Sequence, residues 1–395
     1  MGNFTDLGIN QSLVRILKGN KFERPTDIQE KTIPLILKGK DLIGQAETGS
    51  GKTAACVIPL IQQIDKKLND VQVLILTPTR ELALQYLTEV SSIAIPYGVT
   101  PFVVYGGFNR DIHLAKLRDG VQILVATPGR LIDIIYNDYF SLEHLKTLVI
   151  DEADEMLKMG FIEDVDFIND CIVQKHQTLL FSATMPDPIK RLTKKYMKDA
   201  VHIRLNREQV SPVNLKHYFI RVERGNKERV LKELLSKGDI SQAIVFCNTR
   251  HRVKDVFSNI RSAVRGIDYL HGGLEQNVRT IIVEKFRKRR TRYLITTDVM
   301  ARGIDISSVS HIINYDLPRH PEIYIHRTGR TARLGNKGTA VSLVSPADKE
   351  LYEDIKKIAD ISPVPFKSEQ YSRVSAPAPS RYEKKPLHRP GRRNI

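Results

Sequence analysis

The sequence is poor in cysteine, contains no tryptophan, and has no hydrophobic run long enough to cross a bilayer. Its three cysteines, Cys56, Cys171 and Cys247, lie far apart and form no CxxC pair. This spacing indicates neither a disulfide framework nor a zinc site, and it fits a reducing compartment. The amino-terminal segment also lacks the long apolar stretch of a signal peptide. We therefore expect a soluble, cytoplasmic protein that makes no membrane contact.

Acidic residues are scarce only in the second half of the chain. The formal net charge is +16, but through residue 210 the sequence has 25 Lys and Arg against 26 Asp and Glu. The remaining residues carry 36 basic and 19 acidic side chains. Such an asymmetry favours a polyanionic partner, because phosphate contacts release counterions. A well-solvated basic surface is the alternative interpretation.

The length of 395 residues suits two domains, and the pattern of the sequence agrees. Short β-branched or apolar runs alternate with longer helical patterns, which predicts parallel strands joined by crossover helices. The expected strands are 71–77, 121–127, 145–151 and 177–184, then 242–249, 267–272, 292–298, 309–316 and 338–344. We predict two α/β lobes, each a mostly parallel sheet with helices on both faces. Their bounds are 1–208 and 217–365, with a linker at 209–216 and a basic, proline-rich, disordered tail at 366–395.

The octet "AETGSGKT" at residues 46–53 predicts a phosphate-binding loop. Small residues let backbone N–H groups converge on an anion, and a lysine and a threonine follow at the first turn of the next helix. The predicted nucleotide ligands are Thr48, Gly49, Ser50, Gly51, Lys52 and Thr53, and the Thr53 hydroxyl is also predicted to hold Mg²⁺. The octet begins with Ala46 and lacks the first glycine of the strict pattern, so a flexible turn is the alternative.

An acidic motif, "LVIDEAD", places Asp151 at the end of a hydrophobic strand with Glu152 beside it. A carboxylate there is costly unless it serves a cation, and magnesium is the natural one. We expect Asp151 to hold the ion and Glu152 to deprotonate the water that attacks the γ-phosphate. An ordinary acidic helix start is the alternative.

The ordered set of motifs resembles the DEAD-box family of ATP-dependent RNA helicases. It consists of "AETGSGKT", "PTRELA", "TPGR", "DEAD" and "SAT", then "VFCNT", "HGGLEQNVR", "TTDVMARGID" and "HRTGRTAR". The resemblance covers roughly residues 4 to 344. It implies two RecA-like lobes that close when ATP and single-stranded RNA bind between them.

The resemblance also implies roles for single residues. Gln29 and Phe22 would contact the adenine, Gly303 and Asp305 the ribose side, and Arg330 and Arg333 would act as arginine fingers. A guanidinium delivered by the other lobe stabilises the charge on the transferred phosphate. Lys21 stands where the family often has glycine, and the interpretation of Gly303 and Asp305 as a tight turn is open.

Backbone-directed RNA contact is implied for a further group. Its members are Pro78, Thr79, Arg80, Gly106, Gly107, Thr127, Gly129 and Arg130, then Asn248, Thr249, Arg250, Gln276, Arg279 and Thr297. Hydroxyl and amide groups among them can contact 2′-OH groups. Residues 127–129 also fit an ordinary strand-to-helix turn. Coupling of hydrolysis to strand separation is implied for Asp154, Ser182, Thr184 and His326, with a core histidine as the alternative for His326.

We therefore expect a monomeric RNA-dependent ATPase, using ATP and Mg²⁺, that locally unwinds short RNA duplexes without sequence preference. Ribonucleoprotein partners are also expected. An ATP-dependent RNA clamp and a DNA helicase are the alternatives. The basic run "KFRKRRTR" at 285–292 matches no motif of the family, so a solvated face and an additional RNA contact both remain open for it.

Overall fold

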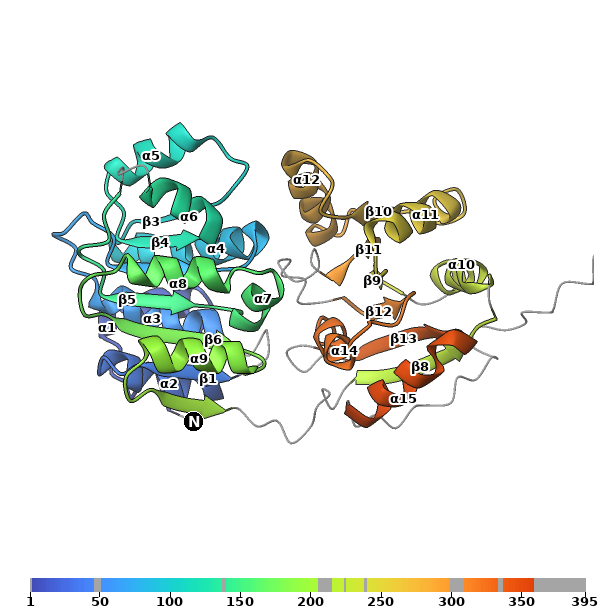
Figure 1. The fold of residues 1–395 in the computed structure, drawn as a ribbon, viewed down its shortest axis with the longest axis horizontal. Coiled ribbons are helices and arrows are strands. Elements are labelled where there is room, and N and C mark those ends of the chain that lie inside the picture. Colours follow the sequence, from blue (N-terminus) through green and yellow to red (C-terminus); the bar gives the residue numbers. More distant parts are fainter. Residues whose placement is uncertain are drawn as a thin grey trace, which may run out of the picture.

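Two parallel β-sheets, one in each half of the chain, organise the molecule (Figure 1). The structure is a computed structural model and describes residues 2–45, 51–136, 140–204, 215–223, 225–237, 240–298, 309–332 and 337–358. The first sheet has the strand order β3-β4-β2-β5-β6-β1-β7 and the second the order β10-β11-β9-β12-β13-β8. Every pair of neighbouring strands is parallel. The prediction of two α/β lobes is therefore confirmed.

The first lobe begins with two helices and then alternates strands with helices. Its strands are β1 (Leu42–Gln45), β2 (Val73–Leu76), β3 (Pro101–Val104), β4 (Ile123–Ala126), β5 (Thr147–Ile150), β6 (Gln177–Ser182) and β7 (Val201–Arg204). Its helices are α1 (Gln11–Gly19), α2 (Asp27–Leu37), α3 (Lys52–Gln63), α4 (Arg80–Tyr97), α5 (Arg110–Arg118), α6 (Pro128–Ile135), α7 (Ala153–Lys158), α8 (Ile162–Asp170) and α9 (Asp187–Tyr196).

The second lobe repeats the alternation. Its strands are β8 (Leu215–Arg221), β9 (Ala243–Phe246), β10 (Ile267–Leu270), β11 (Tyr293–Thr296), β12 (His311–Asn314) and β13 (Gly338–Val344). Its helices are α10 (Lys227–Lys237), α11 (Arg250–Ile260), α12 (Gln276–Arg287), α14 (Pro321–Thr328), the 3₁₀ turn η1 (Pro346–Asp348) and α15 (Lys349–Ile358). Residues 215 and 216, which the sequence assigns to the linker, lie in β8, and the predicted tail 366–395 lies outside the described residues.

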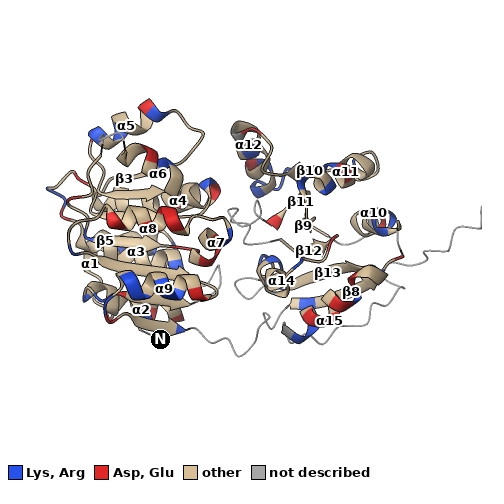
Figure 2. Ribbon diagram, in the orientation of Figure 1, with Lys and Arg blue, Asp and Glu red and all other residues tan. Residues whose placement is uncertain are grey.

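Each sheet is buried on both faces because alternate residues of a strand point to opposite sides. In β2, Val73 and Ile75 pack into one hydrophobic cluster, while Leu74 and Leu76 pack into another on the opposite face. Figure 2 shows the result: charged residues lie mostly along the covering helices, and the strands are largely uncharged. Charged side chains are thereby kept largely off the strands.

No helix among the described residues combines the length and the apolar character that a membrane crossing requires.

Burial of His217 makes the stability of the fold depend on pH. His217 of β8 is buried, its Nδ1 lies 2.8 Å from the Tyr324 hydroxyl, and burial lowers its pKa from 6.5 to about 4. Between these two values the unfolded chain takes up a proton that the folded chain does not, so stability rises with pH in this window. We expect the contribution of His217 to the free energy of unfolding to fall by up to about 3 kcal/mol as the pH drops from 6.5 to 4.

Urea unfolding followed by circular dichroism at several pH values measures this effect. His217→Gln should remove about a third of the pH dependence, because burial also lowers the pKa values of His113 and His311 to about 4. The same change at His251, whose side chain is 87% exposed, should have no such effect. An equal slope in His217→Gln and the unmodified protein would show that this histidine is not responsible.

Candidate active site between the two lobes

The motifs converge because each follows the carboxyl end of a strand, and in a parallel sheet these ends share one edge. Residue 51 lies in the turn after β1, Asp151 directly follows β5, and Ser182 ends β6. In the strand order, β5, β6 and β1 are neighbours. Gly51, the acidic motif and the serine motif therefore follow neighbouring strands at one end of the sheet.

The predicted phosphate-binding turn is described only at its end, where α3 begins. Gly51 is the N-cap of α3 with φ +94°, a left-handed conformation that favours glycine. A Cβ atom there would lie 2.9 Å from Gln29 Nε2 and 3.0 Å from Thr26 Oγ1, so a side chain is excluded by contact as well. Lys52 follows at the helix start and is 5% exposed. The predicted ligands Thr48, Gly49 and Ser50 lie outside the described residues.

Gln29 connects helix α2 to this turn. Its Oε1 accepts a hydrogen bond from the Thr26 backbone N–H at 3.0 Å, which closes a capping box at the start of α2. Its Nε2 donates to the carbonyl oxygen of Gly51 at 3.3 Å. Phe22 is half-buried against the same core, and Lys21 before it has φ 64°, the conformation that glycine adopts most easily.

The Asp151 carboxylate is buried and held by two donors. Its Oδ1 accepts the backbone N–H of Glu152 at 2.8 Å, and its Oδ2 accepts the hydroxyl of Tyr86 at 2.6 Å. Tyr86 comes from α4 and is almost completely buried. Burial, followed by the charge of Asp151, raises the pKa of Tyr86, which keeps its hydroxyl protonated as a donor. Sequence reasoning missed this tyrosine.

Glu152 occupies an unusual backbone conformation at the start of α7. Its φ of 54° and ψ of 48° are left-handed, and such strain in a residue other than glycine is typical of functional positions. Burial is the main reason why its pKa rises from 4.5 to about 7, and Asp151 adds to the rise. Arg330 and Lys52 act in the opposite direction. A carboxylate with a pKa near neutrality is suited to accept a proton.

Asp154 joins the acidic motif to the serine motif and to the second lobe. Its Oδ2 accepts the Thr184 hydroxyl at 3.0 Å, and its backbone N–H donates to Ser182 Oγ at 3.2 Å. Burial alone would raise the pKa of Asp154. The charge of His326, with help from Lys158 and from the hydrogen bonds of Ser182 and Thr184, instead lowers it. The four predicted coupling residues are thus together in the structure.

A cavity between the lobes brings the predicted catalytic groups to one place. Lys52, Glu152 and Asp154 line it from the first lobe, and His326 and Arg330 line it from the second. Arg330 is 3% exposed. The other three residues that the family resemblance assigns to the nucleotide, Gly303, Asp305 and Arg333, lie outside the described residues.

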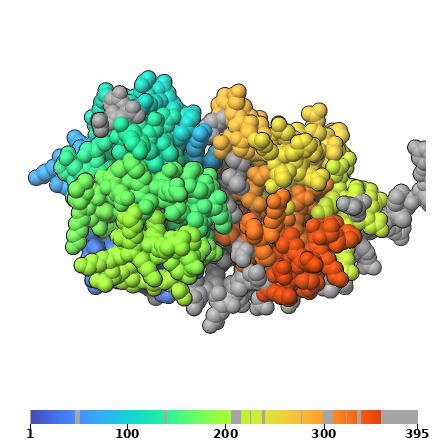
Figure 3. Space-filling view, in the orientation of Figure 1, coloured from blue at the N-terminus to red at the C-terminus, as the bar shows by residue number. Residues whose placement is uncertain are grey.

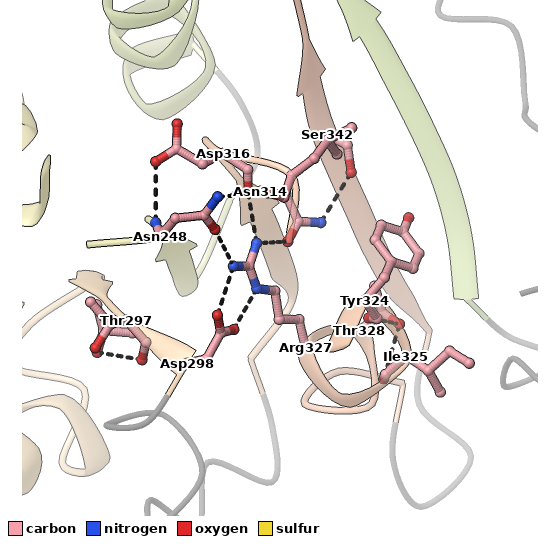
Figure 4. Close-up of polar contacts among 12 residues, drawn as sticks. Asn248, Thr297, Asp298, Asn314, Asp316, Tyr324, Ile325, Arg327, Thr328 and Ser342 are labelled. Atoms are coloured by element: carbon pink, nitrogen blue, oxygen red, sulfur yellow. Dashed lines mark hydrogen bonds and ion pairs between the residues drawn. The ribbon is translucent and has the colours of Figure 1, made fainter. Parts of the chain in front are cut away.

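Arg327, three residues before Arg330, forms a network of hydrogen bonds within the second lobe (Figure 4). Its Nε and one terminal nitrogen donate to the two carboxylate oxygens of Asp298, at 2.5 and 2.9 Å. The same terminal nitrogen donates to Asn248 Oδ1 at 2.9 Å. The other donates to Asn314 Oδ1 at 3.1 Å and to the Asp316 carbonyl at 2.7 Å. The guanidinium therefore ties α14 to the ends of β9, β11 and β12.

Several predicted RNA-contact residues of the first lobe begin helices. Thr79 is the N-cap of α4 and Thr127 that of α6. Arg80 packs so closely on the glycine loop that a Cβ on Gly107 would lie 2.5 Å from it. Arg130 pairs with Asp133 at 3.0 Å. Pro78 is buried, and the glycines Gly106, Gly107 and Gly129 are partly or fully exposed.

The predicted RNA contacts of the second lobe divide into two groups. The Asn248 side chain bonds within its own lobe: it accepts from Arg327 and donates to the Leu317 carbonyl at 2.8 Å. Thr249, Arg250 and Thr297 are at least partly exposed at the ends of β9 and β11. Gln276 begins α12, but its side chain lies outside what the structure describes.

Arg279 of α12 crosses between the lobes. It forms an ion pair with Glu81 of α4, and both side chains are nearly buried. Figure 3 shows the α12 region of the second lobe against the first lobe. Glu81 follows Arg80 in the motif "PTRELA", so this pair joins two of the predicted RNA-binding motifs.

The basic run 285–292 lies at the amino-terminal ends of the strands of the second sheet, between α12 and β11. Its five basic residues from 285 to 290 are exposed at the end of α12, and Arg292 precedes β11. The motif residues follow the opposite ends of the strands. The run therefore does not line the cavity that the motifs surround.

The two parallel-sheet lobes share a cavity that is lined by Lys52 and Glu152 of the first and by Arg330 of the second. This is the arrangement of a RecA-like nucleotide hydrolase. Two family models match the chain: DEAD/DEAH box helicase over residues 26–192 and Helicase conserved C-terminal domain over residues 226–335. The chain belongs to the DEAD-box family of ATP-dependent RNA helicases, which makes it an ATP-dependent enzyme that acts on RNA. The predicted family, fold and enzyme class are confirmed.

Relatives and solved structures agree with this assignment. The chain is 43% identical to the ATP-dependent RNA helicase CshA of Listeria monocytogenes over 348 residues, which is 88% of this chain and 67% of the relative. It is 40% identical to CshA of Limosilactobacillus reuteri, over 92% of this chain and 73% of the relative. S. cerevisiae Dbp5 bound to RNA and ADP BeF3 matches with a TM-score of 0.85 and 31% identity, over 93% of this chain and 96% of that one. A DEAD box protein from Methanococcus jannaschii matches with a TM-score of 0.55 and 37% identity, over 92% and 99%.

Proposed function

We propose that this chain hydrolyses ATP in the cavity between its lobes when RNA is bound, and that it separates short RNA duplexes locally. The observation that carries the proposal is the cavity itself, because Glu152 of one lobe and Arg330 of the other line it together. Hydrolysis then requires the lobes to be together. RNA that bridges the lobes would favour that arrangement and so stimulate the reaction.

The residues at the phosphate-binding turn fit a nucleotide with Mg²⁺. Lys52 would contact the phosphates, and Gln29 and Phe22 the adenine. The Thr53 hydroxyl and the Asp151 carboxylate are hard oxygen donors of the kind that Mg²⁺ prefers. Asp151 is 4% exposed, and the donors described above for its carboxylate are a tyrosine hydroxyl and a backbone N–H, both uncharged. When bound, Mg²⁺ would neutralise charge on the phosphate oxygens.

Glu152 and Arg330 would carry the hydrolytic step. Glu152 takes a proton from the water that attacks the γ-phosphate, for which its raised pKa suits it. Arg330 stabilises the negative charge on the transferred group. Arg333 is proposed as a second such arginine, and Gly303 and Asp305 as contacts to the ribose side, on the family resemblance.

RNA would run across both lobes on the exposed motif residues. Arg80, the glycine loop, Thr127 and Arg130 would contact its backbone from the first lobe, and Thr249, Arg250 and Thr297 from the second. The arrangement of the lobes supports this proposal. The chain matches the Dbp5 complex with RNA and ADP BeF3 at a TM-score of 0.85, but a Dbp5 complex with nup159, gle1, ip6 and ADP at 0.66.

We also propose a monomer with lobe bounds at residues 1–208 and 217–365. The second of these ranges begins within β8, so its structural start is Leu215. A cytoplasmic location is proposed from the unpaired state of all three cysteines. The segment 366–395 is proposed as an additional RNA contact because of its basic composition.

Strand displacement by the purified chain tests the proposed function. A short RNA duplex with a labelled strand should be separated over many turnovers in the presence of ATP, and a matched DNA duplex should stimulate ATP hydrolysis less. ATP-dependent retention of RNA without any displacement would instead support an RNA clamp. Equal stimulation by RNA and DNA would contradict the preference for RNA.

A further inference from the structure

A single hydroxyl group from α4 reaches the acidic motif. Tyr86 is 1% exposed, and its Oη donates to Asp151 Oδ2 at 2.6 Å. This distance is typical of a strong hydrogen bond from a hydroxyl to a carboxylate. The contact spans 65 residues of sequence and joins the interior of a helix to the end of β5.

The tyrosine is one of two donors that fix the orientation of the carboxylate. The Glu152 backbone N–H binds Oδ1 and the Tyr86 hydroxyl binds Oδ2, so each oxygen has one fixed partner. An ionised carboxylate offers about four lone-pair sites, which leaves positions on both oxygens for a metal ion or its water shell. Without the tyrosine, only the backbone donor on one oxygen would restrain the group.

The same tyrosine is connected to the phosphate-binding helix. Cys56 of α3 is buried and interacts with both Tyr86 and Asp151. Its thiol donates to the carbonyl oxygen of Thr53 at 3.2 Å. Cys56 thus lies near Tyr86 and Asp151 and is hydrogen-bonded to Thr53, the other residue proposed to hold Mg²⁺.

We propose that Tyr86 is a positioning residue that orients the Asp151 carboxylate for Mg²⁺. This inference rests on the role of Asp151 under the proposed function. Removing a residue that hydrogen-bonds to a metal ligand and orients it commonly weakens metal affinity by about 10- to 100-fold. The tyrosine itself does not touch the nucleotide or the ion.

Tyr86→Phe tests the proposal because it removes the hydroxyl and keeps the ring that packs in the core. The affinity for a fluorescent, non-hydrolysable ATP analogue is measured by equilibrium titration at a series of Mg²⁺ concentrations and in EDTA. We expect the Mg²⁺ concentration for half-maximal binding to rise at least about 10-fold. The affinity in EDTA should be unchanged.

Tyr293→Phe is the matched control. Tyr293 is also 1% exposed, and its hydroxyl donates to the Leu235 carbonyl at 2.9 Å in the second lobe. Its removal should lower thermal stability as much as Tyr86→Phe does and leave the Mg²⁺ dependence unchanged. An equal shift in both variants would overturn the proposal, because the effect would then reflect general stability.

Asp151→Asn separates failure of this inference from failure of the proposed function. If Asp151→Asn abolishes the Mg²⁺ dependence while Tyr86→Phe leaves it intact, Asp151 holds the ion and the role of Tyr86 is wrong. If Asp151→Asn itself retains the Mg²⁺ dependence of the unmodified protein, the assignment of Asp151 is wrong. A shift in Tyr86→Phe together with a loss in Asp151→Asn supports both.

Discussion

Glu152→Gln should reduce RNA-stimulated ATP hydrolysis by about 10²- to 10⁴-fold while ATP and RNA still bind. The amide keeps the size of the side chain but cannot accept a proton from the attacking water. Under the proposed function the lobes close on bound ATP and RNA and reopen after hydrolysis, so the variant should retain RNA for longer than the unmodified protein. Phosphate release measures the first effect, and fluorescence anisotropy of labelled RNA with ATP measures the second.

Glu155→Gln is the matched control for this prediction. Glu155 lines the same cavity and is 5% exposed, and its carboxylate pairs with Lys158 Nζ at 3.8 Å. Its turnover should stay within a few-fold of the unmodified protein. Near-normal turnover in Glu152→Gln would show that another group activates the water.

Arg330→Ala should lower the hydrolysis rate by about 10³- to 10⁵-fold. Arg330→Lys should recover only part of this loss, since a lysine keeps the positive charge but not the planar, two-pronged donor. The first lobe, with Lys52 and Glu152, is untouched, so the affinity for ATP without RNA should change much less than the rate. Single-turnover hydrolysis at saturating ATP and RNA gives the rate directly.

Arg319→Lys provides the control from the same lobe, because Arg319 is exposed and lies outside the cavity. It should hydrolyse ATP normally. A small effect of Arg330→Ala, with RNA stimulation preserved, would mean that Arg330 does not supply the charge proposed for it.

Much of the fold could be predicted from hydrophobic runs. Strands β2, β4 and β5 are buried at every position and read in the sequence as continuous apolar segments. Strand β7 was not anticipated, because it lies at the edge of the first sheet and only Ile203 of its four residues is buried. β8 was missed for the same reason, and part of it was assigned to the linker.

The candidate site was predictable where residues belong to motifs, and unpredictable where a partner comes from a helix interior. Asp151 and Glu152 could be placed because they directly follow a strand. Tyr86 could not, since nothing in its local sequence distinguishes it from a core residue until α4 is packed against β5. Arg327 stands inside the motif "HRTGRTAR", but its contacts with Asp298 and Asn314 depend on the arrangement of three strands.

Gln29 illustrates how one side chain can constrain two properties of an enzyme. Its carbonyl end completes the cap of α2, and its amide end holds the carbonyl of the glycine from which α3 starts. Replacing Gln29 by a residue that accepts guanine would also remove its hydrogen bond to the Gly51 carbonyl. That bond holds the start of the helix that carries Lys52. Given the proposed contacts of Gln29 with adenine and of Lys52 with the phosphates, a change of Gln29 should alter base preference and phosphate affinity together. Restoring the affinity would require another hydrogen bond to the Gly51 carbonyl.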